Sequence, residues 1–256
     1  MEHTQVVQEE RGGGLHLRVH ALTHVTRFSR SAEGQLNEHR DLDGRFMVEA
    51  RLEGGGVLLE PGAFLYSVGR IEAEVRQQQA GGFLRRAVAT AGSGESAFAT
   101  HFGGRGTVWT EPSNRHFLIS STDRPDDTVL LDDGAFYLAQ DTMQLGSHRH
   151  TNISGALSGN GLQQPKLTGQ GLFVVESPVP VSEVEVIEVN AGQGLVVDGD
   201  MMLMYTGNLQ VSLRPLVRGL RNMLRSGEGL VYTFSGEGTV FLTPTARRVS
   251  AASVAG

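Results

Sequence analysis

A short pattern built around two glycines occurs three times along this chain of 256 residues. In each copy one residue separates the glycines, and apolar or β-branched residues follow them. The second glycines of the three copies, Gly106, Gly171 and Gly238, follow one another at intervals of 65 and 67 residues. A repeat of fixed period is typical of a chain made of similar supersecondary units. The pattern therefore predicts three related units.

Two further anchors precede each Gly-x-Gly pair in the same order. The nearer anchor is a Gly-Glu or Gly-Asn pair, and the farther one is an apolar run that ends in an acidic turn. The anchor residues of the three units are Gly62, Gly134, Gly199, Glu95, Asn160, Glu228, Gly104, Gly106, Gly169, Gly171, Gly236 and Gly238. The anchors divide the chain into an N-terminal extension, a single domain of three repeats and a C-terminal tail. These parts span 1–42, 43–245 (repeats at 43–110, 115–177 and 182–244) and 246–256.

The anchors predict an all-β fold. Each apolar run contains β-branched residues and is followed by Glu-Pro-Gly, Asp-Asp-Gly or Asp-Gly, which indicates a short buried strand and a turn. We expect the apolar residues after the turn to return as a second strand, so that each unit opens with a hairpin. A Gly-x-Gly pair between two strands indicates a bulge, or a place where another backbone comes close.

One segment departs from the β pattern. Apolar residues between Leu213 and Leu224 recur at helical spacing, and Pro215 suits a first helical turn. The opposite face carries Arg214, Arg218, Arg221 and Arg225. A shorter counterpart lies at 83–88 in the first unit, whereas the second unit has no clear stripe at 152–158. Short helices are thus predicted in units 1 and 3. The arginine face is either a solvated helix surface or a contact with an anionic membrane or a protein partner.

Composition excludes several classes of function. The formal net charge of −6 argues against non-specific nucleic-acid binding, which depends on a basic surface. The absence of cysteine excludes disulfides and thiolate chemistry and favours a cytoplasmic location. Residues 1–11 lack the apolar core of a signal peptide.

The chemically reactive residues have plainer interpretations. His16, His20 and His24 are spaced by four, but alternating apolar residues between them favour a strand with a polar face. His148 and His150 lie in a predicted polar loop, and neither histidine group assembles enough ligands for a metal.

The acidic residues and the glycine pairs are likewise not assigned to chemistry. Glu60, Asp132, Asp133 and Asp198 occupy equivalent turns, so turn stabilisation accounts for them. Gly-x-Gly is followed by strand rather than by the helix of a phosphate loop. No catalytic residue, metal or cofactor is assigned.

The triplicated order of acidic-Pro-Gly-Ala, Gly-Glu and Gly-x-Gly-x-Val resembles the AIM24 family over about 43–245. Its clearest carriers are Glu60–Ala63, Arg218–Leu220 and Gly227–Val240. The resemblance implies three TRAP-like β units, so named for the tryptophan RNA-binding attenuation protein, with pseudo-threefold symmetry. It offers no catalytic residues, and a mitochondrial member is linked to inner-membrane organisation. This chain departs from the family at its N-terminal extension, at Asn160 and at the missing second helix.

Two classes of function remain open. The first is a non-enzymatic structural or interaction protein that binds copies of itself or another protein, with peripheral membrane contact through the arginine face. The second is a ligand-binding protein or enzyme with a pocket between the repeats, located where the repeats differ, at Asn160 and His148–His150. RNA binding by fold analogy is a weaker third hypothesis, because the chain is acidic.

Overall fold

The structure is a computed structural model that describes residues 3–75, 99–150, 162–215 and 230–246. These residues form strands and two short 3₁₀ turns, Val181–Glu183 and Gly199–Met201. The all-β prediction is therefore confirmed. Within the described part of the chain, no helix is long and apolar enough to cross a membrane.

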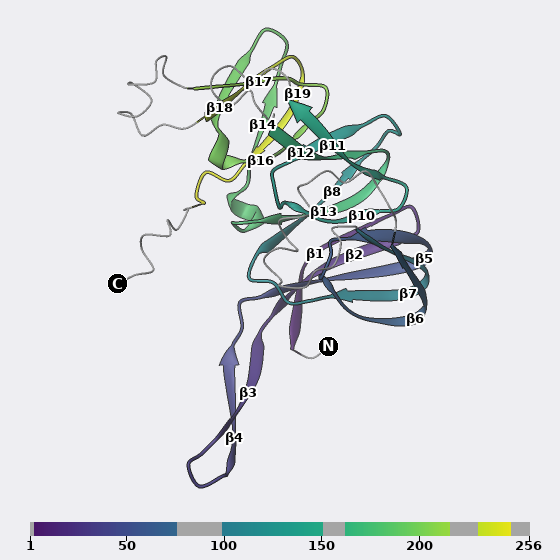
Figure 1. Cartoon of the computed structure of the whole chain (residues 1–256), viewed down its shortest axis with the longest axis vertical. Coiled ribbons are helices and arrows are strands. Elements are labelled where there is room, and N and C mark those ends of the chain that lie inside the picture. The colour runs from purple at the N-terminus through teal and green to yellow at the C-terminus, as the bar shows by residue number, and fades with distance from the viewer. Residues whose placement is uncertain (1–2, 76–98, 151–161, 216–229, 247–256) are drawn as a thin grey trace.

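The largest sheet has eight strands and forms the lower part of the body in Figure 1. Six strands follow one another across it, and β7 and β6 extend it from β5. In this order the strands are β1 (Thr4–Gly12), β2 (Leu15–Leu22), β5 (Phe46–Leu59), β10 (Phe136–Gln140), β13 (Gly171–Ser177) and β8 (His116–Thr122), with β7 (Thr100–Thr110) and β6 (Phe64–Val75). The N-terminal residues belong to this sheet, because β2 pairs with β5 and buries Leu15, Leu17 and Val19 in the core.

Two further sheets continue the body toward its upper end (Figure 1). The second sheet has six strands: β11 (Gln144–His150), β12 (Leu162–Thr168), β9 (Thr128–Leu131), β16 (Met202–Thr206), β19 (Gly238–Leu242) and β14 (Glu185–Val189). The third sheet has three: β15 (Gly194–Asp198), β18 (Leu230–Ser235) and β17 (Gln210–Pro215). The described strands thus form sheets of unequal size, and the pseudo-threefold arrangement of TRAP-like units stays a prediction.

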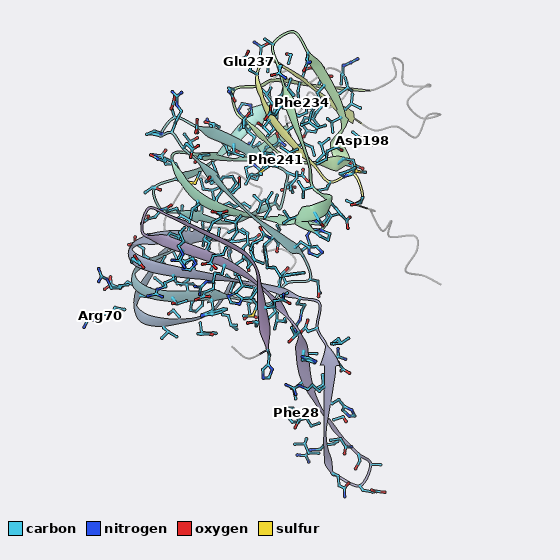
Figure 2. The ribbon with its side chains drawn as sticks, turned by 180° about the vertical axis from the view of Figure 1, so that it is seen from behind. Phe28, Arg70, Asp198, Phe234, Glu237 and Phe241 are labelled. Atoms are coloured by element: carbon cyan, nitrogen blue, oxygen red, sulfur yellow. The ribbon has the colours of Figure 1, made fainter. Side chains whose placement is uncertain are left out.

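A two-stranded arm projects from the lower end of the body (Figure 1). It consists of β3 (His24–Arg30) and β4 (Leu36–Leu42), which pair with each other along their whole length. Phe28 is 62% exposed and lies well away from the body in Figure 2. Leu36 and Leu42 are also exposed, so the arm carries apolar side chains that the described residues leave uncovered.

The predicted opening hairpins are wrong. The strands on either side of each acidic turn do not pair with each other: β5 and β6 are both bonded to β7, and β9 and β10 belong to different sheets. The third turn likewise carries the chain from β15 in one sheet to β16 in another. The physical reason is burial, since strands such as β10, buried at every residue, require a neighbour on both edges and cover on both faces.

The predicted helix in the third unit is wrong at its start. Leu213, Arg214 and Pro215 belong to strand β17, which pairs with β18. The remainder of that segment and the segment at 83–88 lie outside the described residues. The predicted loop at His148–His150 is a strand as well, because Gln144–His150 pairs residue by residue with β12.

Candidate functional site: the exposed strand edges

The first repeat is joined to the second, and the second to the third, by strand pairings of the same kind. Strand β10 adds to β5 with Leu138 opposite Leu59, and the Glu60 N–H donates to the Tyr137 carbonyl oxygen at 2.8 Å. Strand β16 adds to β9 with Met204 opposite Leu131. In each joint, the strand that follows one acidic turn pairs with the strand that precedes the previous turn.

Strand β6 has the same local form as β10 and β16. Each of the three strands shows a register shift against its own neighbour one residue after it begins: between Phe64 and Tyr66, between Phe136 and Leu138, and between Met202 and Met204. This irregularity aligns Tyr66 with Leu138 and Met204. By this alignment β6 corresponds to β10 and β16, the strands that pair with a strand of the preceding repeat.

No strand in the described part of the chain occupies the outer edge of β6. The strand pairs with β7 alone, and its side chains are exposed except for the partly buried Ile71, whereas every residue of β10 is buried. Val68 is 61% exposed, and Phe64, Leu65 and Tyr66 also reach solvent. The first half of β6 is thus an apolar strand with an open edge, a feature that folded proteins usually protect.

Strand β15 has the complementary open edge. It pairs with β18 and with no other described strand. Val196, in its middle, is 47% exposed, whereas its counterparts Leu58 and Leu130 in β5 and β9 are 0% and 4% exposed. The difference arises because β10 and β16 cover β5 and β9, while no described strand covers β15.

The open edges of β6 and β15 lie at opposite ends of the body. Figure 2 shows Arg70 of β6 projecting from the lower body and Asp198, the last residue of β15, at the upper end. These two edges of one chain thus lie apart from each other. Strand β6 has the form of the strand that β15 lacks as a neighbour, and β15 has the form of the strand that β6 lacks.

The Gly-x-Gly pair of the first unit explains how β6 and β7 approach closely. Gly104 and Gly106 lie inside the continuous strand β7, and a side chain at either would come within 2.2 Å of a β6 carbonyl oxygen. The predicted close approach of another backbone is thus confirmed there. In the second and third segments the glycine pairs connect β12 to β13 and β18 to β19, and strand follows each. Glu95, Asn160 and Glu228 lie outside the described residues.

The arginine face can be placed at one residue. Arg214 is exposed on β17, where its Nε donates to the Thr233 hydroxyl oxygen at 3.1 Å. Arg218, Arg221 and Arg225 lie outside the described residues, and the contact predicted for the face stays a prediction.

The N-terminal histidines are structural. The predicted strand at His16 and His20 is confirmed as β2, and both side chains are buried. His16 Nε2 lies 2.6 Å from the Glu9 carboxylate, and His20 Nε2 lies 2.9 Å from that of Glu49. His24 begins the arm. Among the described residues, no three histidine or acidic side chains are arranged to hold a metal ion.

The acidic turns differ in their surroundings. Asp198 accepts a hydrogen bond from the backbone N–H of Asp200 at 3.1 Å, as a turn residue does. Glu60 is partly buried, and this burial, with the nearby Glu176 carboxylate, raises its pKa to about 8. Burial also raises the pKa of Glu176, and Arg115 and Ser113 partly offset that effect.

These features define a class: an all-β protein of several sheets joined by repeated strand addition, in which β6 and β15 each have an edge that no described strand covers. The chain belongs to the family described as Mitochondrial biogenesis AIM24, whose model matches residues 42–245. It is 25% identical over 234 residues to an uncharacterized protein of Streptococcus pyogenes serotype M6, covering 88% of this chain and 92% of that protein. A crystal structure of a Streptococcus pyogenes protein has a similar fold, with a TM-score of 0.56 and 20% identity over 86% of this chain and 93% of that one.

Proposed function

We propose that this protein is a non-enzymatic structural protein that assembles head to tail with copies of itself. In the assembly, β6 of one copy adds to β15 of the next. The observation that supports this most directly is the pairing of β10 with β5 and of β16 with β9, since both internal joints use the same register. Transferring that register to the open edges places Tyr66 opposite Val197 of the neighbouring copy.

The chemistry of β6 supports addition of a strand. Its charged residues, Arg70, Glu72 and Glu74, lie in the second half, and the first half from Phe64 to Gly69 carries no charge. Charged residues on an edge strand are a common defence against pairing. Their absence where the internal joints would place a partner favours an edge that is covered in the working protein.

The two contact surfaces differ, so the interface is heterologous. Such an interface closes into a ring when successive rotations add to a full turn, and otherwise extends as a filament. A second copy of the chain is the occupant that fits best, because the open edge of β15 matches the surfaces that β5 and β9 offer inside the same molecule.

Other aspects of the proposal rest on composition and on the arrangement of charge. The acidic turns at Glu60, Asp132 and Asp198 come at the ends of separate strands, which favours a structural role over acid–base catalysis. The lack of cysteine supports a cytoplasmic location. Peripheral membrane contact through the arginine face would add to the assembly and does not replace it.

The test is the mass of the protein in solution, measured by size-exclusion chromatography with light scattering. Wild type is expected to exceed the 27.5 kDa of one chain. Val196→Lys places a charge at the centre of the proposed interface and is expected to give monomers, because burying an unpaired ammonium group costs several kcal/mol.

A matched control separates this effect from general damage. Val186 is 54% exposed on β14, another edge strand, but lies outside the proposed contact, so Val186→Lys is expected to keep the mass of wild type. A monomeric wild type, or equal masses for the two variants, would contradict the proposal. Circular dichroism and thermal unfolding check that both variants fold.

A further inference from the structure

The two-stranded arm presents different chemistry on its two faces. Strands β3 and β4 pair without a register shift, so directly opposite residues share a face. One face, here called the apolar face, is built from four such pairs. From the base of the arm to its tip they are His24–Leu42, Thr26–Arg40, Phe28–Glu38 and Arg30–Leu36. The exposed large apolar side chains of the arm, Phe28, Leu36 and Leu42, therefore all lie on this face.

The polar side chains of the opposite face bind one another. Arg27 Nε lies 3.4 Å from the Asp41 carboxylate, and the Ser29 hydroxyl oxygen lies 2.9 Å from His39 Nε2. Val25, next to the base of the arm, is partly buried. This face is therefore stabilised by contacts within the arm itself.

The apolar face is left uncovered. Leu42 is 85% exposed, Leu36 is exposed as well, and Phe28 lies clear of the body in Figure 2. A single two-stranded hairpin is marginally stable in water, whereas a ribbon gains stability when a further layer covers its apolar side. The arm thus has the form of half of a contact.

Two charged side chains at the centre of the apolar face form no ion pair with any described residue. They are Glu38 and Arg40. Arg40 contacts His3 Nδ1 through one guanidinium nitrogen at 3.2 Å, so its other N–H groups are available. The centre of the face therefore offers one carboxylate and one guanidinium group, the kind of self-complementary surface that a twofold contact requires.

A second copy of the arm matches this pattern when the two apolar faces stack in opposite directions. A twofold axis across the strands then places the first pair of one arm on the fourth pair of the other, and the second pair on the third. Each Arg40 meets Glu38 of the other copy, and each Leu42 meets Leu36 of the other copy. Sheets stacked face to face lie about 10 Å apart, a distance that two facing side chains span together. Stacking in the same direction would instead set Phe28 against Glu38.

We infer that two copies of this protein pair through the apolar faces of their arms. The face has far fewer residues than the roughly 20 that each side of a stable interface contributes, so the contact is weak, with a dissociation constant of the order of 100 μM. Val196→Lys is therefore still expected to be monomeric when dilute. The contact uses neither β6 nor β15, so it would connect one head-to-tail assembly to another.

Sedimentation equilibrium of Val196→Lys tests this contact in the absence of strand assembly. The mass is expected to rise from that of one chain toward that of two between about 5 and about 500 μM, a range that spans the expected dissociation constant. Glu38→Arg and Arg40→Glu, each added singly, place like charges in both central contacts and are expected to weaken pairing about tenfold or more. The two together restore complementarity, so the combined variant is expected to pair within about threefold of Val196→Lys alone.

Asn37→Arg is the matched control, because Asn37 is exposed on the opposite face of the arm, next to Glu38. It is expected to pair as Val196→Lys does. Glu38→Arg reduces the net negative charge of the chain, so general repulsion between copies cannot account for weaker pairing.

Three results would overturn the inference: the mass of one chain at every concentration, equal weakening by Asn37→Arg, or a combined variant that pairs no better than the single ones. The arm would then be left for a different protein. The outcome is separate from that of the strand assembly, because a wild type that is monomeric when dilute can carry the same substitutions.

Discussion

The backbone N–H of Asp132 donates a hydrogen bond to the carbonyl oxygen of Leu203 at 2.8 Å. Glu60 makes the same bond, at the same distance, to Tyr137. In both cases the residue that begins one acidic turn donates a backbone hydrogen bond to the strand that follows the next acidic turn. Asp198 begins the third acidic turn, and the proposed assembly gives its N–H the carbonyl oxygen of Leu65 in a neighbouring copy.

This register makes an engineered cross-link specific. Val68 and Leu195 correspond to Gln140 and Val57, which face each other in the internal joint. Facing Cα atoms in antiparallel strands are roughly 4.5–5.5 Å apart, which a disulfide spans. The double variant Val68→Cys with Leu195→Cys is expected to form covalent multimers on oxidation, seen on non-reducing gels, because the natural chain contains no cysteine.

An off-register pair is the control for that cross-link. Arg70→Cys with Leu195→Cys moves one partner two residues along the same face of β6, where the Cβ atoms would stand too far apart for an unstrained bond. This pair is expected to cross-link much more slowly. Equal rates for the two pairs would mean that β6 and β15 do not meet in the proposed register.

Glu60 makes stability depend on pH. Because its carboxyl pKa is raised from 4.5 to about 8 in the folded protein, the folded state holds this proton more tightly than the unfolded state does. Its stabilising contribution is complete below pH 4.5 and is lost as pH rises toward and through about 8. The loss is of the order of several kcal/mol, at roughly 1.4 kcal/mol for each unit between the two pKa values.

Substitution of Glu60 tests this pH dependence. Glu60→Gln is expected to be more stable than wild type at pH 9 and to flatten the profile between pH 5 and 8, measured by urea unfolding. The exposed Glu53 on β5 provides the control, and Glu53→Gln should keep the wild-type profile. If the free energy of unfolding of Glu60→Gln falls with pH as steeply as that of wild type, the pH dependence comes from another group.

Gly104 is required for the contact between β6 and β7. Its φ is +126°, and an added Cβ would lie 2.2 Å from the carbonyl oxygen of Arg70. Gly104→Ala is therefore expected to lower the free energy of unfolding by about 2 kcal/mol or more, from backbone strain and displacement of β6. Gly44→Ala meets nothing within 4 Å, so its effect should stay within about 0.5 kcal/mol. Denaturant midpoints of the two variants compare these costs.

The arm is expected to contribute little to the stability of the body. Its strands pair with each other alone among the described strands, and the Asp43 N–H donates to the Thr23 carbonyl oxygen at its base. Replacing residues 24–42 by Asn-Gly would close this base with a tight turn. The midpoint of thermal unfolding should stay within about 3 °C of that of wild type, a change that corresponds to less than about 1 kcal/mol. A much larger drop would show that the arm supports the core.

The sequence predicted the structural features that depend on residues close together in the chain. Apolar runs and turn residues identify strands such as β9 and β15, and the strand that follows Gly106 or Gly238 excludes a phosphate loop. The prediction of opening hairpins was wrong because one strand–turn–strand pattern is compatible with two structures. The two strands can pair with each other, or the turn can carry the chain to another sheet. The choice depends on long-range burial, which no local pattern records.

The contacts of the candidate sites were mostly beyond sequence reasoning. The open edge of β6 is seen once β10 and β16 are known to be covered. One signal was present but missed: glycines at 12–14 separate two β-type segments, and a hairpin there places Glu9 beside His16. The partner of His20, Glu49, lies 29 residues away and had no such signal.

The two ends of the body differ, because one presents β6 and the other β15. Assembly through these edges therefore has a direction, because each copy contributes β6 to one neighbour and β15 to the other. A copy in which β15 is blocked would still attach through β6 but would accept no successor. Small amounts of such a copy would stop growth among unaltered neighbours, so damage confined to one edge would act dominantly on the whole population.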